Sequence, residues 1–292
     1  MKQIRIGTCS FNYPSWQGIV YSRAKDINFL KEYSQHFDSV EIDRWFWSLF
    51  NREKAVLPDP RVVREYLEST PDDFRFSVKV PNSITLTHFY SKGTRGMLEQ
   101  NPFFLSSSVY EDFLEILEPL AKKIDTLIFQ FEYLNQQKMR DGKEFIGQIG
   151  SFFQKVPRNL PAAVEVRNSK YLTRPYFEFL RHMDLAHVFL QGYWMPAITD
   201  LYDRFADLTG SRAVIRLMGE DRKGIEKLTG KKWDKIVLEK DEEIRSIAGT
   251  IRSMLDRNTF VTVNVNNHYQ GSAPLTISRL RAALDEKSVS GP

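Results

Sequence analysis

Ionisable and amide side chains alternate with apolar ones in several short stretches of this 292-residue chain. Examples are VEID (40–43), FSVKV (76–80), AVEVR (163–167), VIRL (214–217) and VTVNVN (261–266). Successive side chains of a strand point to opposite faces, so one face of each stretch is apolar and the other polar. The polar set comprises Glu41, Asp43, Ser77, Lys79, Gln130, Glu165, Arg167, Arg216, Asn264 and Asn266.

The cations of this set predict a site for an oxyanion. Lys79, Arg167 and Arg216 can hold a phosphate or a carboxylate, because guanidinium groups match such anions with paired hydrogen bonds. Amide and aromatic side chains near the strand ends are candidates to complete the substrate site: Gln130, Asn264, Asn266, Asn267, Tyr13 and Trp16.

The candidates for proton transfer are two carboxylates and two histidines. Glu41 and Glu165 could serve as an acid and base pair in glycoside hydrolysis. A neighbouring cation opposes this chemistry, since it lowers the pKa of a carboxyl group. His88 and His268 follow strand-like stretches and are candidate general acids or bases, although ordinary loop histidines fit equally well.

Other chemistry is less favoured by the spacing. Lys79 is a candidate catalytic lysine, but neighbouring carboxylates oppose the low pKa that a Schiff base needs. Asp43 and Glu165 are the residues that would hold a divalent metal such as magnesium; the sequence lacks HxH and HExxH patterns, so no cofactor is clearly implied. The single cysteine, Cys9, fits a small buried residue better than a nucleophile.

The polar set also has a purely structural explanation. Charged groups inside a barrel must be paired, and a buried network of ion pairs can fill the interior without any activity. We favour a functional site, because the ends of barrel strands commonly carry active sites and the interior is otherwise filled by Val, Ile and Leu.

Composition limits the class of protein. The chain is 42% hydrophobic and 27% charged, as in ordinary globular proteins, and its formal net charge of +4 permits an anionic ligand. No apolar run approaches the roughly 20 residues that span a bilayer, and the N-terminus lacks the pattern of a signal peptide. These features predict a cytoplasmic protein without a membrane partner.

Strand-like and helix-like stretches alternate along the whole chain. We expect strands at 4–8, 39–43, 75–80, 125–131, 162–167, 186–190, 213–217 and 259–266. We expect helices at 27–36, 59–69, 109–122, 142–155, 173–184, 241–256 and 274–286, with Asp59, Thr173 and Ser272 as caps. In the connection 191–212, ITDLYDRFADL is a candidate short helix, but its helical period is poor. Eight such units, without a glycine-rich phosphate loop after the first strand, predict a single (β/α)8 TIM barrel over residues 1–292.

The connections that follow the strands are rich in aromatic and basic residues. The aromatic residues are Phe11, Tyr13, Trp16, Trp45, Phe46, Trp47, Phe89, Tyr90, Tyr171, Tyr193, Trp194 and Tyr269. The basic residues are Lys92, Arg95, Lys170, Arg222, Lys223, Lys227, Lys231 and Lys232. Such a combination suits stacking on bases with neutralisation of phosphates, although long loops also need small apolar cores of their own.

Seven ordered motifs resemble the YecE-like family, also called domain of unknown function 72. They are GTCSFNYPSWQGIVY, SVEIDRWFWSL, FRFSVKVPNSITLTH, LIFQF, AVEVRNSKY, VIRLMG and VNVNNHYQGSAP. The sequence departs from the family at Cys9 and Phe11, where Ser and Trp are common, and at Met218, where a His is usual. The resemblance implies a TIM barrel and supplies no activity.

These observations predict an enzyme that acts on an anionic, phosphorylated substrate at the C-terminal ends of the strands. The reaction would be phosphoester hydrolysis on a nucleotide or nucleic acid. The alternatives are a nucleic-acid-binding protein without catalysis, a glycosidase that uses Glu41 and Glu165, and an inert charged core. The substrate, the oligomeric state and the biological process do not follow from the sequence.

Overall fold

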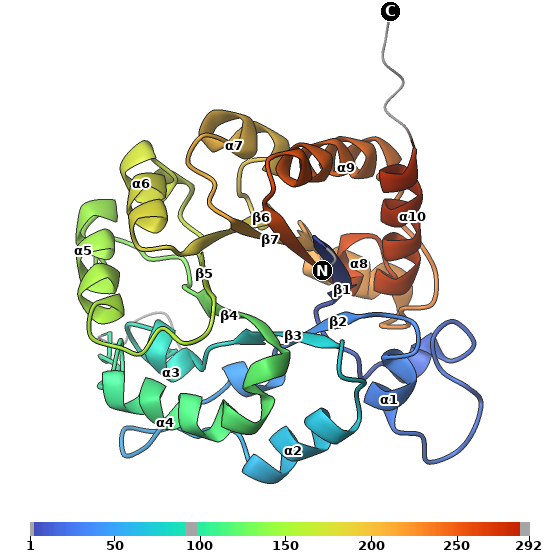
Figure 1. The fold of residues 1–292 in the computed structure, drawn as a ribbon, viewed down its shortest axis with the longest axis horizontal. Coiled ribbons are helices and arrows are strands. Elements are labelled where there is room, and N and C mark those ends of the chain that lie inside the picture. Colours follow the sequence, from blue (N-terminus) through green and yellow to red (C-terminus); the bar gives the residue numbers. More distant parts are fainter. Residues whose placement is uncertain (1–2, 91–97, 287–292) are drawn as a thin grey trace, which may run out of the picture. The chain divides into compact units, whose positions relative to one another are not determined.

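The computed structural model describes residues 3–90 and 98–286 and contains a closed parallel barrel of eight strands in sequence order (Figure 1). The strands are β1 (Ile4–Thr8), β2 (Ser39–Ile42), β3 (Arg75–Lys79), β4 (Ile124–Gln130), β5 (Ala162–Glu165), β6 (Ala186–Gly192), β7 (Arg212–Gly219) and β8 (Phe260–Val265). The predicted (β/α)8 class is confirmed.

The chain divides into two compact units. Unit 1 comprises Met1–Val40 with Phe189–Pro292, and unit 2 comprises Glu41–Val188. The prediction of one domain over residues 1–292 therefore stays a prediction, and each unit is described by itself below.

In unit 1, strand β8 pairs with β1 on one side and β7 on the other. The register places Asn264 opposite Gly7 and opposite Arg216. The α-helices of unit 1 are α1 (Phe29–Tyr33), α7 (Ile198–Phe205), α8 (Arg222–Thr229), α9 (Asp241–Asp256) and α10 (Ala273–Asp285), with 3₁₀ turns η1 (Pro14–Trp16) and η5 (Asn267–Tyr269).

In unit 2, strand β4 pairs with β3 and β5. The α-helices are α2 (Pro60–Glu68), α3 (Asn82–Thr85), α4 (Ser107–Leu117), α5 (Gly142–Phe153) and α6 (Arg174–His182). The 3₁₀ segments are η2 (Arg44–Phe46), η3 (Glu118–Lys123) and η4 (Ser169–Tyr171).

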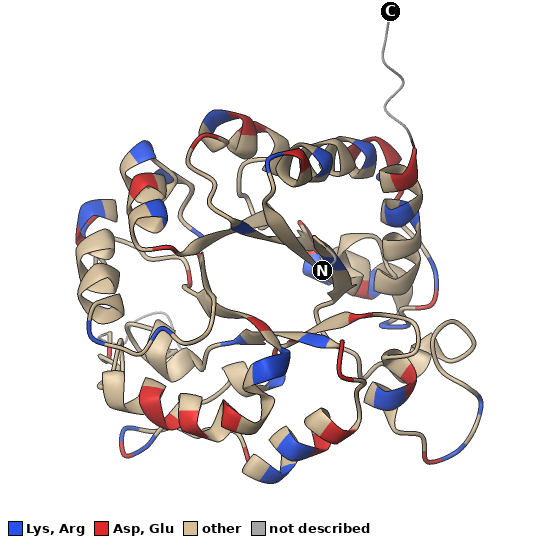
Figure 2. Cartoon of the chain, in the orientation of Figure 1, with Lys and Arg blue, Asp and Glu red and all other residues tan. Residues whose placement is uncertain are grey.

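Aromatic contacts show which face of a strand packs on the helices. The ring of Phe129 on β4 lies 5.5 Å from that of Tyr110 on α4 and 4.9 Å from that of Phe153 on α5. The next apolar residue of the same parity, Phe131, packs on Phe145 of α5 at 4.9 Å. Since side chains alternate along a strand, Gln130 points to the opposite face, as predicted. Charged residues accordingly appear on the strands as well as on the helices (Figure 2).

Helix starts follow the expected chemistry only in part. Asp59 accepts a hydrogen bond from the Arg61 amide at 2.8 Å and begins α2. Thr173 and Ser272 occupy the N-cap positions of α6 and α10, but neither makes a side-chain capping bond. In both helices the second residue is a proline, Pro175 or Pro274, which has no amide hydrogen to satisfy.

Of two further helices of unit 1, α7 was expected only as a candidate short helix and α8 was not predicted. The α7 helix lies in the stretch of poor period, and α8 is short and strongly charged, with Ile225 and Thr229 as its buried residues. Among the described residues, no helix combines the length and hydrophobicity needed to cross a membrane.

Candidate functional site

A buried ion pair lies at the end of strand β5 in unit 2. The Nε and Nη2 atoms of Arg167 each lie 3.1 Å from Oε1 of Glu165. Glu165 is fully buried, whereas 24% of the Arg167 side chain is exposed. A buried carboxylate needs a partner, so Glu165 holds the Arg167 guanidinium in place. Because this guanidinium is partly exposed, a ligand can still reach it.

Lys79, at the end of β3, contacts the first of several neighbouring aromatic rings, and the last of these rings are exposed on the surface of unit 2. Its Nζ lies 3.9 Å from the ring centroid of Phe46, which is 5.3 Å from the ring of Trp47. The Trp47 ring lies 6.2 Å from that of Tyr90, and these two side chains are 57% and 55% exposed. An exposed aromatic pair beside a cation suits a planar, charged ligand.

His88 lies in the same part of unit 2. Its Nδ1 is 2.9 Å from the Thr87 hydroxyl. Burial lowers the pKa of His88, as does the nearby Lys138 ammonium, while Glu132 opposes this shift. The imidazole is therefore neutral at neutral pH and can accept a proton.

The ion pair of Lys138 and Glu132 connects His88 with the arginine. Lys138 Nζ lies 2.6 Å from Glu132 Oε1. Tyr90 interacts electrostatically with both Glu132 and Arg167. These contacts and electrostatic interactions define what we call the unit 2 cluster: Phe46, Trp47, Lys79, His88, Tyr90, Glu132, Lys138, Glu165 and Arg167.

Sequence reasoning missed two members of this cluster. Glu132 lies two residues after Gln130 and has the same parity, so the alternation of β4 continued by two residues would have found it. Lys138 lies in the connection after β4, where no periodic signal exists. Of the other candidates in unit 2, Glu41 is fully buried and Gln130 pairs in register with Glu165.

The metal candidates Asp43 and Glu165 both belong to unit 2. No group of three or more His, Cys, Asp or Glu side chains with the geometry of a metal site occurs within residues 3–90 and 98–286. We therefore build no step on a metal, and a metal site at Asp43 and Glu165 stays a prediction.

In unit 1, Arg216 and Asn264 lie side by side on β7 and β8 and are buried. The Asn264 side chain is fully buried, and neither its Nδ2 nor its Oδ1 has a hydrogen-bond partner within the described part of the chain. A buried amide without partners costs free energy, which makes Asn264 a candidate for a role other than fold stability.

His268 is held by residues from two directions in unit 1. Its Nδ1 contacts the Asn266 carboxamide oxygen, which also accepts a bond of 2.9 Å from the His268 amide. Its Nε2 lies 3.2 Å from Oε1 of Glu226 on α8, and its ring packs on Trp233 at 4.9 Å. Burial lowers the pKa of His268, and the hydrogen bond to Glu226 opposes this. Glu226 and Trp233 were not predicted, since nothing in the sequence pairs α8 with the end of β8.

The remaining candidates of unit 1 have structural positions. Trp16 is fully buried, and its ring lies 4.7 Å from that of Tyr13. Both line a narrow crevice with Asn267, whose Oδ1 accepts a hydrogen bond of 2.8 Å from the Ala273 amide at the start of α10. Two polar atoms at this crevice, Trp16 Nε1 and Asn267 Nδ2, have no hydrogen-bond partner among the described residues.

The predicted aromatic and basic loops divide into two groups. Trp45, Phe46 and Tyr269 are buried and pack within their units, whereas Trp47, Tyr90 and Trp194 are exposed. Lys92 and Arg95 lie outside the described residues.

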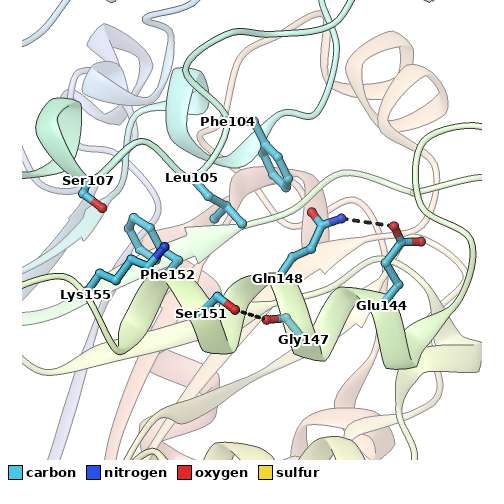
Figure 3. A pocket seen from close by; sticks show the side chains of 9 residues that line it. All are labelled: Phe104, Leu105, Ser107, Glu144, Gly147, Gln148, Ser151, Phe152 and Lys155. Atoms are coloured by element: carbon cyan, nitrogen blue, oxygen red, sulfur yellow. Dashed lines mark hydrogen bonds between the residues drawn. The ribbon is translucent and has the colours of Figure 1, made fainter.

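A separate groove of about 650 Å³ lies on the helical side of unit 2 (Figure 3). It is lined by α5 and by the segment before α4, with Phe104, Leu105 and Phe152 as its apolar residues. Gln148 donates a hydrogen bond of 3.2 Å to Glu144 along one wall (Figure 3). None of its lining residues was predicted as a site, and none belongs to a strand end.

The fold and the polar strand ends define a (β/α)8-barrel protein with candidate ligand sites at the ends of its strands. The pattern of the family described as protein of unknown function DUF72 matches residues 5–291, and the chain belongs to this family. The resemblance seen in the seven motifs is thereby confirmed.

Relatives of known sequence and structure agree with this family. The UPF0759 protein YecE of Escherichia coli K12 is 27% identical over 171 residues, which are 59% of this chain and 51% of that protein. The alignment thus covers about half the length of this relative.

Two crystal structures of DUF72 family proteins share the fold. The protein from Enterococcus faecalis V583 has a TM-score of 0.66 at 20% identity, covering 97% of this chain and 96% of its own. The protein from Thermotoga maritima has a TM-score of 0.63 at 21% identity, covering 95% and 96%. At these identities the likeness concerns the fold alone.

Proposed function

We propose that this protein is an enzyme that binds a phosphorylated substrate at the unit 2 cluster and hydrolyses a phosphoester of a nucleotide or nucleic acid. One observation carries the proposal. Ring contacts join Lys79 with an exposed aromatic pair, and electrostatic interactions link this pair with Arg167 and link the neutral His88 with Lys138. Cations suit phosphate oxygens, and exposed rings suit a base.

The residues take distinct roles in this proposal. Arg167 and Lys79 bind the phosphoryl oxygens, and Trp47 and Tyr90 stack on the base. His88 accepts a proton from water as the water oxygen bonds to phosphorus. The ester P–O bond then breaks, and the leaving oxygen takes a proton from solvent. Glu165 positions Arg167, because its Oε1 accepts a hydrogen bond from Nε of that residue and lies 3.1 Å from its Nη2.

A steady-state assay with two substrates tests these roles. The substrates are bis(4-nitrophenyl) phosphate and a fluorescent single-stranded DNA oligonucleotide, each with and without added Mg²⁺. His88→Gln should lower kcat by about 10²–10⁴ with little change in KM, as expected for loss of a general base. Tyr90→Ala should raise KM for the oligonucleotide by about tenfold, because one stacking contact is lost.

Tyr133→Ala is the matched control for Tyr90→Ala. Tyr133 is also an exposed tyrosine of unit 2, it interacts electrostatically with Tyr171, and it is not a member of the unit 2 cluster. This variant should behave as the wild type. Wild-type kcat in His88→Gln, or no turnover of either substrate under any condition, would remove hydrolysis from the proposal.

Binding of nucleic acid without catalysis is the second candidate. The observation that favours it is the exposure of Trp47 and Tyr90, since stacking needs no reaction. In this case oligonucleotide affinity falls steeply with salt and depends on Tyr90, while no product forms.

A further inference from the structure

Three segments of unit 1 approach one another backbone against backbone: the last residue of β6, the last residue of β7, and η5. A Cβ atom on Gly192 (φ +117°) would lie 2.2 Å from the Gly219 carbonyl oxygen. A Cβ atom on Gly219 (φ +79°) would lie 2.2 Å from the His268 carbonyl oxygen. Such approaches are open to glycine alone. They place the segments that follow Gly192 and Gly219 beside each other and beside His268.

The first of these segments is a strained turn that exposes a tryptophan. Tyr193 (φ 53°) and Trp194 (φ 64°) both have left-handed backbone conformations, and the Met195 amide donates a hydrogen bond of 3.1 Å to the Gly192 carbonyl. Turns with two left-handed central residues favour Asn and Gly, because a bulky side chain is strained there. Trp194 is nevertheless 93% exposed.

Neither the strained backbone of this turn nor the exposure of the Trp194 indole stabilises the fold. The neighbouring Tyr193 packs on the buried cluster of Cys9, Leu190 and Met218, which anchors the turn. Trp194 gains no comparable burial. Strained residues of this kind occur where a side chain is presented to a ligand, so the turn is a candidate contact surface.

The second segment supplies positive charge beside these rings. Arg222, at the start of α8, interacts electrostatically with Tyr193 and with Tyr13. Helix α8 and the residues that follow it expose six cations within 222–235, against Glu226 and Asp234 as the acidic residues of that range. The cations are Arg222, Lys223, Lys227, Lys231, Lys232 and Lys235.

We propose that this surface of unit 1 binds single-stranded nucleic acid, with Trp194 stacking on a base and the cations of 222–235 contacting the phosphates. The charge decides between ligand classes. Two of the six cations, Arg222 and Lys231, are paired with Glu226 at 2.8 and 3.8 Å, so the net charge of the segment decides. A neutral sugar can also stack on an indole, but it gains nothing from an excess of exposed cations over carboxylates, whereas a polyanion does. This contact does not depend on hydrolysis at the unit 2 cluster.

Fluorescence of Trp194 gives a direct test. Of the five tryptophans, Trp16, Trp45 and Trp233 are buried, and only Trp47 and Trp194 are exposed. In a Trp47→Phe background, quenching by acrylamide therefore reports Trp194. Titration with an oligo(dT) should quench this emission, and the apparent Kd should rise at least tenfold between 50 and 200 mM salt, as for a protein that contacts several phosphates.

Variants separate the role of the indole from the stability of the turn. Trp194→Gly should weaken oligo(dT) binding by about tenfold and leave the melting temperature at or above that of the wild type, because glycine tolerates the left-handed conformation. Trp194→Phe keeps a ring and should retain most of the affinity. Asn258→Gly is the matched control, since it relieves another left-handed residue (φ 59°) at the end of α9 and should leave binding unchanged.

Three results would overturn the proposal. They are wild-type affinity in Trp194→Gly, Trp194 emission that does not respond while a labelled oligo(dT) binds, and quenching by neutral oligosaccharides without salt dependence. Loss of turnover in His88→Gln with unchanged quenching of Trp194 would leave the proposal intact, so the two sites are tested separately.

Discussion

Asn264 offers a sharp test of whether the polar strand ends are kept for stability. Its side chain is fully buried on β8, between Val263 and Val265, and both amide atoms lack a partner among the described residues. We predict that Asn264→Val stabilises the protein. This runs against the usual outcome of a buried substitution, which is destabilising.

The magnitude follows from the two unsatisfied groups. Each buried donor or acceptor without a partner costs about 1–3 kcal/mol, so removal of both gains about 4 kcal/mol at the centre of that range. Adjustment of neighbours to the different shape offsets part of this gain by about 1–3 kcal/mol. We expect a net increase of about 2 kcal/mol in the free energy of unfolding, or about 4 °C in melting temperature for a chain of this size.

Asn266→Val is the matched control, because it makes the same substitution two residues away with the opposite expected sign. The Asn266 side chain accepts a hydrogen bond of 2.9 Å from the His268 amide and caps η5. Its loss should destabilise the protein by about 1 kcal/mol.

Urea unfolding and thermal melts of both variants decide the matter. Stabilisation of Asn264→Val by about 2 kcal/mol would show that the asparagine opposes stability and is retained for another reason. Destabilisation by 1 kcal/mol or more would refute the reasoning, since it would mean that the amide is satisfied by water or another group in the folded protein.

Three further predictions concern the ion pair, pH and the loop junction. Arg167→Gln should cost about 3 kcal/mol by leaving the Glu165 carboxylate buried without this cation, and the double variant with Glu165→Gln should recover most of it in urea unfolding. Burial lowers the pKa of His187 from 6.5 to about 3, so below pH 6.5 the unfolded chain takes up a proton that the folded one does not. As the pH falls from 6.5 to about 3, the free energy of unfolding should therefore decrease by up to about 1.4 kcal/mol per pH unit. His187→Phe should reduce this slope in thermal melts between pH 4 and 6.5. Gly192→Ala should destabilise the protein by more than about 3 kcal/mol. Gly210→Ala is the control and should be near neutral, because its added Cβ would meet nothing within 4 Å. Equal stability of the two variants would contradict the close approach of Gly192 to Gly219.

The sequence by itself determined the class of fold and the face of each strand. Alternation of Val and polar residues along 261–266 predicts a strand with one face against helices, and local pairing produces that strand at Phe260–Val265. Helix α9 was predicted at its observed bounds because its 16 residues repeat an apolar period over four turns. Such patterns are local, so they can be read without knowing the partners.

Tertiary structure alone decided which polar residues meet. The contact of His268 with Glu226 joins positions 42 apart in sequence, and the series from Lys79 through Trp47 and Tyr90 to Arg167 joins four segments. The left-handed turn that exposes Trp194 follows directly after the close approach of Gly192 to Gly219. The periodicity of the sequence carries no information on such long-range contacts, because they depend on how loops of irregular length pack at the ends of the strands.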